Sequence, residues 1–410
     1  MSKSRFALPD RLRDARLQAD LTQEQVADYL GIRRPAIAEI EAGKRAVKST
    51  ELVQLAELYG KTLRWLVEGA ESPEDRIAAA LFRAGEPTSP LLRREAAKLA
   101  RRCRLVNDLE RKLDLERRHD TIPQYHSERA VKDFSQATQH ARDVAYQERA
   151  RLGLGTAGPI RDVWGLLEDA GLHVFPLRLG RDTEIDGVFT RPAEARACVG
   201  VNVDKWVFRQ AFTVVHEYAH ALMDGDIVGE ACATGRAWSD ATRGEYANRE
   251  LRANQFAAVF LVPRESLLRY LRSRERLARE RGKERANDLT PIDIVRGQDH
   301  FGVSAEMLLW RLQNEDLIDA AERKRLAEEI EKAGGVIALA RALGYDWRDR
   351  AQPVTRTQEL ALKGYVKGLV SLGILAEIFD RAKEDMVELL RSWSVMQEPG
   401  PSDALVGTPR

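Results

Sequence analysis

The sequence has few of the residues that mark secreted or membrane proteins. Its 410 residues include only three cysteines, Cys103, Cys198 and Cys232, an odd number at wide spacing. This usage argues against a disulfide framework and predicts a reducing, cytoplasmic setting. No apolar run approaches the length of about eighteen residues that a membrane span needs, and residues 1–5 lead into no signal-peptide core. Neither a membrane segment nor a signal peptide is therefore expected.

Net charge is also nearly absent. The chain carries 65 Lys/Arg and 64 Asp/Glu, a formal net charge of +1, and 44% of its residues are hydrophobic. The charge balance excludes a strongly basic or acidic protein and so indicates nothing about partners. The hydrophobic content is enough for ordinary globular cores, and a chain of this length is expected to form about two to four domains.

Histidine is scarce as well, yet two of the seven stand four residues apart in His216-Glu217-Tyr218-Ala219-His220. The flanking residues are apolar, which predicts a buried helix on which residues four apart share a face. Both imidazoles can then reach one metal ion, with Glu217 placed to take a proton from a water on that metal. The motif indicates a zinc-dependent peptidase. The alternative is a buried amphipathic helix whose histidines are held by core hydrogen bonds.

A catalytic zinc site commonly has three protein ligands and an open fourth position. Downstream, residues 246–258 show apolar residues at helical spacing, and Pro263 follows as a helix breaker. Glu250 and Asn254 are four apart there and share one face. Glu250 is the candidate third ligand, and Asn254 is the candidate acceptor for the ring N–H of a ligating histidine. The alternative for Glu250 is a solvated helix carboxylate.

The order of these motifs resembles the ImmA/IrrE family of metallopeptidases. The motifs are strand-like segments at 170–174, 185–187 and 199–202, the histidine pentapeptide, and then Glu250-x-x-Ala253-Asn254 and Leu261-Val262-Pro263. The resemblance covers about residues 151–318 and implies an α+β, zincin-like domain with a small sheet. It implies that His216, His220 and Glu250 bind zinc, with manganese as the alternative metal, and that Glu217 is the general base.

Two features depart from the family pattern. Tyr218-Ala219 stands where the family more often has Leu-Gly, at positions that are not ligands. A long loop from Asp224 to Arg243 leaves the shape of the substrate cleft open. Cys232 lies in that loop, either as an inhibitory thiolate for the metal or as a small buried residue.

Residues 8–69 carry a different pattern of short amphipathic helices separated by glycine turns. Thr22 with Gln25 predicts a capped helix start, and Gly31 predicts a tight turn after it. The segments that resemble the XRE/Cro type of helix-turn-helix are Leu21-Thr22-Gln23-x-x-Val26-Ala27, Gly31-Ile32 and Ile37-x-x-Ile40-Glu41-x-Gly43-Lys44-Arg45. The alternative is a small helical bundle used for protein contacts. The modest balance of twelve Lys/Arg against ten Asp/Glu over residues 1–70 gives that alternative some support.

The helix-turn-helix resemblance implies that the second helix of the pair enters the major groove of DNA. Guanidinium groups suit guanine edges because their fork is bidentate. The residues expected at base edges or the adjacent backbone are Arg33, Arg34, Pro35 and Glu39. Those expected at phosphates are Gln23, Lys44 and Arg45.

The rest of the chain predicts helices without a clear function. Residues 71–150 predict a helical connector, and its segment from 93 to 118 contains ten Lys/Arg and five Asp/Glu. This charge suits a dimer arm, a nucleic-acid contact or a solvated helix face. Residues 321–396 predict a C-terminal helical domain, and 397–410 a disordered tail. The predicted fold is mainly α and multidomain: an all-α helix-turn-helix bundle over 1–70, the connector, an α+β peptidase domain over 151–320, and the C-terminal helices.

Together the patterns predict a DNA-binding transcriptional regulator with an in-chain zinc endopeptidase. The family resemblance implies cleavage of an XRE-type repressor, either this chain or a partner, in a stress, DNA-damage or phage-defence response. The other expected partners are double-stranded operator DNA bound by a homodimer and single-stranded DNA as a candidate activator. Two alternatives stay open: a transcription factor whose zinc domain is a non-catalytic sensor or scaffold, and an interaction module without metal.

Overall fold

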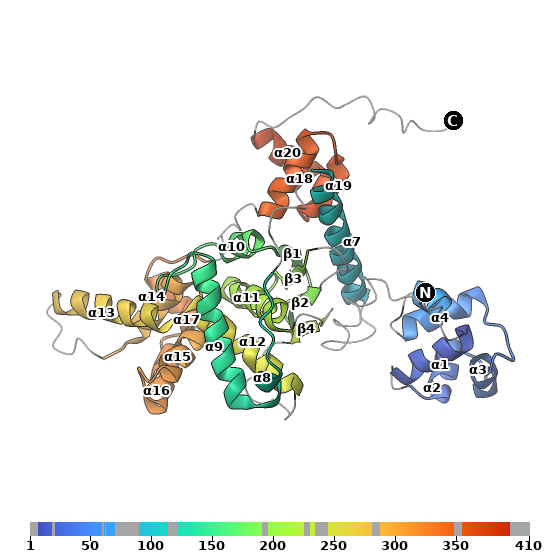
Figure 1. Ribbon diagram of the computed structural model, residues 1–410, viewed down its shortest axis with the longest axis horizontal. Helices are drawn as coiled ribbons and strands as arrows, with labels where there is room; N and C mark the ends of the chain where they lie inside the picture. The colour runs from blue at the N-terminus through green and yellow to red at the C-terminus, as the bar shows by residue number, and fades with distance from the viewer. Residues whose placement is uncertain are drawn as a thin grey trace.

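The computed structural model describes residues 7–18, 21–59, 61, 63–69, 90–113, 122–190, 196–224, 230–233, 245–280, 288–347 and 355–393. These residues form many helices and one small sheet (Figure 1). The predicted fold, mainly α with an α+β central part, is confirmed. Over the described part of the chain, no helix combines the length and the hydropathy that a membrane span requires.

The N-terminal bundle has a core of its own. Its helices are α1 (Leu8–Gln18), α2 (Gln23–Leu30), α3 (Arg34–Glu41), α4 (Ser49–Leu58) and α5 (Leu63–Glu68), and α1–α4 form a separate group at the right of Figure 1. Leu12, Val26, Ile37, Leu55 and Leu66 are buried against one another at its centre. The amphipathic pattern of the first seventy residues therefore closes on itself.

Local signals fix the turn between α2 and α3. The hydroxyl of Thr22 accepts from the Gln25 N–H at 3.2 Å, and the Gln25 side chain accepts from the Thr22 N–H at 2.8 Å, so the predicted capping box is present. Gly31 ends α2 with φ of 65°, a left-handed conformation that is easy only for a residue without Cβ. The next helix then leaves in a new direction, as a helix-turn-helix requires.

A buried ion pair joins α1 to α3. The Nε atom of Arg16 lies 2.6 Å from Glu41 Oε1, and a terminal nitrogen donates to Glu41 Oε2 at 3.0 Å. The other terminal nitrogen donates to the Leu21 carbonyl at 2.8 Å, and the Gln23 amide donates to Glu41 Oε2 at 2.9 Å. Each buried charge is thus stabilised by the other, and loss of one would leave its partner buried and uncompensated.

Arg16→Met is expected to destabilise the N-terminal bundle by about 3 kcal/mol, because Glu41 would keep only Gln23 as a partner. Hydrogen exchange of the full-length protein would show faster exchange across residues 12–66 and unchanged exchange in the central domain. Arg13→Met, at an exposed position of the same helix, is the control. Equal exchange in the two variants would contradict a stabilising role of the pair.

The central sheet contains four described strands in the order β1-β3-β2-β4. They are β1 (His173–Leu177), β2 (Ile185–Thr190), β3 (Cys198–Asn202) and β4 (Glu230–Ala233). β1 is parallel to β3, whereas β2 is antiparallel to β3 and β4. The strand-like segments 185–187 and 199–202 of the sequence lie in β2 and β3, whereas the segment 170–174 overlaps β1 only at His173 and Val174, because Ala170 still caps the preceding helix. Almost every residue of these three strands is buried, so both faces of the sheet are covered.

Helices on one face of the sheet share the larger core. The central helix of this layer is α11 (Val207–Met223), which carries the histidine motif. The helices packed around α11 and the sheet are α8 (Glu128–Lys132), α9 (Phe134–Arg151), α10 (Val163–Asp169) and α12 (Glu245–Leu261). Behind them follow α13 (Arg264–Glu280), α14 (Pro291–Phe301), α15 (Ala305–Asn314), α16 (Ala320–Lys332) and α17 (Gly335–Ala342). The chain thus surrounds α11 and α12 with helices from before and after them in sequence.

The opposite face of the sheet is covered by helices from two distant parts of the chain. These are α7 (Pro90–Lys112), α18 (Arg356–Val366), α19 (Leu372–Ile378) and α20 (Lys383–Ser392); in Figure 1, α18–α20 lie at the top and α7 runs down from them beside the sheet. Leu99 of α7, Phe175 of β1 and Leu375 of α19 belong to one buried cluster. A Cβ added at Gly200 of β3 would lie 2.8 Å from Leu99, so α7 packs closely on the sheet.

This arrangement brings together parts of the chain that lie far apart in sequence. The sequence predicts a helical connector over 71–150 and a C-terminal helical domain over 321–396, and helices of both share a core with the central sheet. The apolar stripe of an amphipathic helix shows that one face is buried, not which neighbour buries it. The domain boundaries themselves stay predictions, and the predicted tail, 397–410, lies outside the described residues.

The free edge of β1 is closed by side chains. The Val174 N–H donates to Glu168 at 3.3 Å, and the Arg178 N–H donates to Glu95 at 3.1 Å. Pro176, between them, has no N–H, and its carbonyl accepts from Arg102 of α7 at 2.9 Å. Such covering prevents another strand from pairing there.

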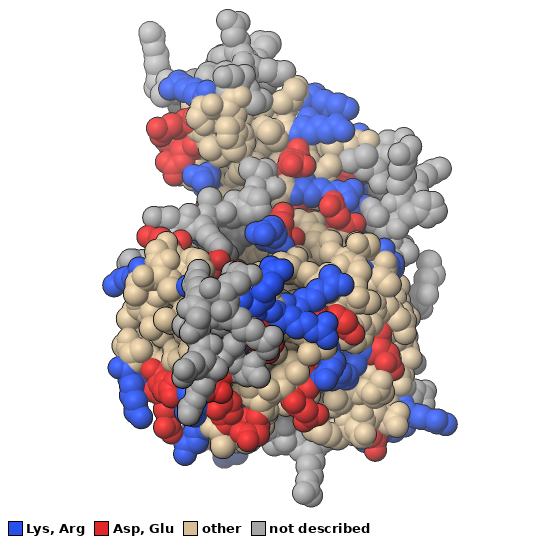
Figure 2. All heavy atoms as spheres, turned by 90° about the vertical axis from the view of Figure 1, so that its left-hand side faces the viewer, with Lys and Arg blue, Asp and Glu red and all other residues tan. Residues whose placement is uncertain are grey.

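The surface shows mixed charge on the face that Figure 2 presents. Both Lys or Arg and Asp or Glu side chains lie on it, with a group of basic side chains near its middle and acidic ones mainly below them. This distribution agrees with the formal net charge of +1. No single-sign field dominates that face.

Candidate metal centre

α11 carries the histidine motif through the middle of the fold. Every residue from Thr213 to Met223 is buried. The helix contacts β2 and β3 on the sheet side and α10 and α12 on its other sides. A buried polar side chain needs a partner to offset its loss of hydration. The two buried imidazoles of His216 and His220 must therefore have partners for their ring nitrogens.

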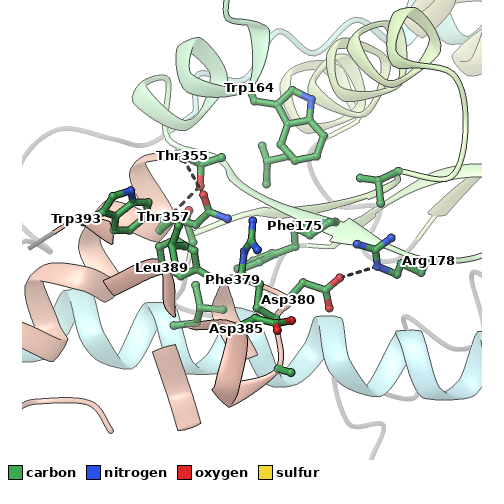
Figure 3. A pocket seen from close by; sticks show the side chains of 17 residues that line it. Trp164, Phe175, Arg178, Thr355, Thr357, Phe379, Asp380, Asp385, Leu389 and Trp393 are labelled. Atoms are coloured by element: carbon green, nitrogen blue, oxygen red, sulfur yellow. Dashed lines mark hydrogen bonds and ion pairs between the residues drawn. The ribbon is translucent and has the colours of Figure 1, made fainter. Parts of the chain in front are cut away.

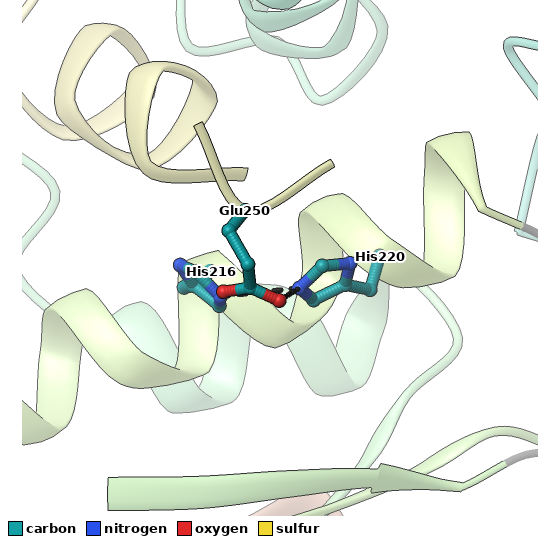
Figure 4. Close-up of side chains that lie close together, drawn as sticks. All are labelled: His216, His220 and Glu250. Atoms are coloured by element: carbon teal, nitrogen blue, oxygen red, sulfur yellow. Dashed lines mark hydrogen bonds and ion pairs between the residues drawn. The ribbon is translucent and has the colours of Figure 1, made fainter. Parts of the chain in front are cut away.

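Glu250 of α12 meets both histidines of α11 (Figure 4). Its two carboxylate oxygens lie 3.3 Å from His216 Nε2 and 3.4 Å from His220 Nε2, and the two Nε2 atoms are 3.1 Å apart. Among the described residues, these three form the one group of His, Cys, Asp or Glu with the proximity of metal ligands. The structure thus brings together the three residues that the sequence predicts as ligands.

The other ring nitrogen of each histidine is held by an acceptor. His216 Nδ1 lies 2.9 Å from Asn254 Oδ1, the partner that the sequence predicts. His220 Nδ1 lies 2.7 Å from Asp224 Oδ2, one helical turn further along the chain. Protons on both Nδ1 atoms would leave both Nε2 lone pairs directed at one point, as metal binding requires.

The sequence reasoning missed Asp224 and Arg252. Asp224 ends α11 and also accepts from the buried guanidinium of Arg252 on α12. The sequence feature that could have identified Asp224 is its position four residues after His220, because residues four apart on a helix share a face. Together they anchor the second histidine between the two helices.

Electrostatics favour the ionised carboxylates. Burial opposes the charge of Glu250, but hydrogen bonds and charge from His216 and His220 hold its pKa well below the usual value. Burial likewise opposes the charge of Asp224, and the hydrogen bond from His220 and the charge of Arg252 more than offset it, so its pKa is lowered too. Both groups are therefore present as anions at neutral pH.

Glu217 lies next to His216 in sequence and is fully buried. A Cβ added at Gly187 of β2 would come within 3.4 Å of Glu217 Oε1 and within 2.5 Å of a methyl of Thr213. Glycine at this position thus lets the strand approach the carboxylate. Near the start of α11, Arg209 pairs with Asp186 of β2 at 2.8 Å, which fixes the helix against the same strand.

Tyr218, one of the departures from the family pattern, is accommodated by a polar cluster. Its hydroxyl donates to the buried carboxylate of Glu148 at 2.5 Å, and Arg151 donates to that hydroxyl at 2.8 Å. Burial raises the pKa of Tyr218, so the hydroxyl stays protonated. The tyrosine therefore links α11 to α9 and leaves the ligand face unchanged.

The donor set fits a zinc ion. Two imidazoles and one carboxylate are the ligands of many catalytic zinc sites, whereas oxygen-only sets suit magnesium or calcium. His216, His220 and Glu250 would hold such an ion from two adjacent helices. The loop between them lies, apart from β4, outside the described residues, and so does the side chain of Cys232.

Asn254→Ala is expected to weaken metal binding by about 10–100-fold, because His216 would lose the acceptor that orients its ring. Competition with a fluorescent zinc chelator measures this affinity. Gln255→Ala, on the same helix and half-buried, is the control. Equal zinc affinity in both variants would show that Asn254 does not orient a ligand.

Most of the predicted DNA contacts lie on the surface of the N-terminal bundle. Arg33, Arg34, Pro35, Glu39 and Lys44 are exposed at the start of α3, along it and in the turn after it. The guanidinium of Arg45 instead pairs with Glu51 at 2.7 Å, and the Gln23 amide is bonded to Glu41. Each of the last two retains further donors for a phosphate, so the seven contacts stay predictions.

Comparison with known families agrees with both parts of the chain. A helix-turn-helix family model matches residues 12–66. A model described as the IrrE N-terminal-like domain matches residues 167–313, a range that includes His216, His220 and Glu250. A search of curated proteins finds no match.

Proposed function

We propose that this chain, an XRE-type helix-turn-helix domain fused to an IrrE-type peptidase-family domain, is a transcriptional regulator that carries its own zinc-dependent endopeptidase. Its substrate is a repressor-type protein, this chain or a partner, in a stress, DNA-damage or phage-defence response. The convergence of His216, His220 and Glu250, with Glu217 beside a ligand, supports this most. A purely structural zinc site has no use for such a base and closes its fourth position with a protein ligand.

The chain's own residues supply the proton transfers. A zinc ion at this site would act as a Lewis acid toward the attacking water and the scissile carbonyl. Glu217 takes the proton of the water onto its carboxylate and later gives it to the leaving amine. Asn254 and Asp224 hold the imidazoles in position through Nδ1. Because Glu217 is buried, the local dielectric constant is low, and the electrostatic attraction between its carboxylate and the proton that it accepts is stronger than in water.

Native mass spectrometry of the full-length protein with zinc, with and without single-stranded DNA, tests this function. The expected result is about one zinc per chain and time-dependent fragments, either of this chain or of an added XRE-type repressor. Zinc binding without cleavage of either protein would favour the sensor or scaffold. Failure to take up zinc would overturn the proposal.

The DNA-binding part makes a separate prediction. On operators selected from random duplexes, Arg34→Ala is expected to weaken the free energy of DNA binding by about 1–3 kcal/mol and to relax specificity at one base-pair position. Lys44→Ala should instead weaken binding to all sequences, and it should reduce the slope of log K against log salt concentration by about one. Fluorescence anisotropy at several salt concentrations measures both effects. Arg13→Ala is the control. Equal DNA binding by Arg34→Ala and Arg13→Ala would mean that Arg34 does not contact the DNA.

A further inference from the structure

A cavity of about 590 Å³ lies between the edge strand β1 and the C-terminal helices. None of the metal-site residues lines it. Its volume falls within the range of about 300–1,000 Å³ that is usual for small-molecule sites. Four aromatic side chains contribute to its walls: Trp164, Phe175, Phe379 and Trp393 (Figure 3). Val174 and Leu389 add aliphatic surface. Such walls suit a ligand with an aromatic ring.

One carboxylate of the wall is already neutralised. Asp380 accepts from Arg178 at 3.1 Å and from the buried guanidinium of Arg102. It adopts φ of 53°, which is uncommon for a residue with a side chain. Its ion pairs hold this turn in place and thereby fix the direction in which the chain enters α20.

Two opposite charges remain among the cavity-lining residues at the start of α20. Arg381 and Asp385 both line the cavity and are exposed, and the structure gives their side chains no ion pair with a described residue. Ala382, the N-cap residue just before α20, provides no side-chain cap. Unbonded N–H groups of the first turn therefore add positive potential beside Arg381. The cavity thus presents aromatic walls, one guanidinium group and one carboxylate.

We propose that this cavity binds a small aromatic zwitterion, a molecule of the class of the aromatic α-amino acids. Its ring packs between the aromatic side chains, its carboxylate pairs with Arg381 and the start of α20, and its ammonium group pairs with Asp385. Guanidinium–carboxylate and ammonium–carboxylate pairs are both charge-assisted hydrogen bonds. The site is independent of the proposed peptidase, because it shares no residue with the metal centre.

Isothermal titration of the full-length protein with L-phenylalanine tests the site. Two analogues separate the charges: 3-phenylpropionate has no ammonium group, and phenethylamine has no carboxylate. We expect L-phenylalanine to bind and each analogue to bind at least about tenfold more weakly, since one charge-assisted bond contributes about that much. Arg381→Ala should weaken L-phenylalanine and leave phenethylamine unchanged. Asp385→Asn should weaken L-phenylalanine and leave 3-phenylpropionate unchanged.

Two further variants make the result decisive. Arg391→Ala, an exposed arginine of α20 outside the cavity lining, should bind as the wild type does. Ala382→Trp places an indole at the cavity without removing a charge and should abolish binding. No heat with L-phenylalanine at millimolar concentration would overturn the proposal. So would binding that is unchanged in Ala382→Trp, or equal losses for all three compounds in Arg381→Ala.

Discussion

Glu217→Gln is expected to bind zinc as the wild type does and to lose at least about a hundredfold of the hydrolytic rate. General bases typically contribute about 10²–10⁴-fold, and an amide cannot take the proton of the attacking water. The shape of the side chain is kept, so its fully buried position against Gly187 can be filled as before. The measurement is the rate of fragment formation from whichever substrate the wild type cleaves, with zinc content read from the same sample.

Glu306→Gln, an exposed substitution of the same type in the same domain, controls for the loss of one carboxylate. It should cleave at the wild-type rate. Full activity of Glu217→Gln would show that another group is the general base and would contradict the proposed mechanism. Loss of zinc together with activity would instead mean that Glu217 supports the metal centre structurally.

The metal-site residues could be predicted because spacing on a helix fixes geometry. His216 and His220 are four apart on one helix, and Glu250 and Asn254 are four apart on another. Each pair therefore shares a face whatever the rest of the fold does. The packing of α11 on α12 brings the two faces together. The sequence showed the faces, and the family resemblance implied their meeting.

Asp224 and Arg252 were harder to predict for a physical reason. Their role depends on a contact between two helices, in which Arg252 of α12 reaches the carboxylate at the end of α11. Charged residues are common on helices and are usually solvated, so neither one stands out in the sequence. Only the packing shows that both are buried and paired.

The second face of the sheet shows the same limit. The apolar stripe of α7, with Leu99 and Val106, indicates a buried face, and the apolar residues of α18–α20 do the same. Nothing in either stripe names the other or the sheet as partner, because hydrophobic burial is not directional. Arg102 is informative in retrospect. A buried arginine must find acceptors, and this one finds Pro176 of β1 and Glu377 of α19.

Glu250→Ala is expected to abolish stable zinc binding while Glu217→Gln preserves it. Of the three ligand candidates that the described residues offer, only the two histidines would remain, with Nε2 atoms 3.1 Å apart. A zinc concentration of about 100 times the dissociation constant should stabilise the wild type by about 2.7 kcal/mol, and this gain should disappear in the variant. Thermal unfolding with and without zinc measures the loss, and native mass spectrometry should show the metal content fall from about one per chain to near zero.

Gln255→Ala, half-buried on the same helix, should keep the zinc-dependent stabilisation and serves as the control. Zinc retained at full stoichiometry in Glu250→Ala would mean that another side chain completes the site. The thiol of Cys232, which lies between the two ligand helices in sequence, is the first to test, since thiolates are strong zinc ligands. Retention of zinc in Glu250→Ala together with its loss in Cys232→Ser alone would assign the third ligand to the cysteine. The predicted role of Glu250 would then be wrong, and the site would fit the closed, non-catalytic alternative better than a peptidase.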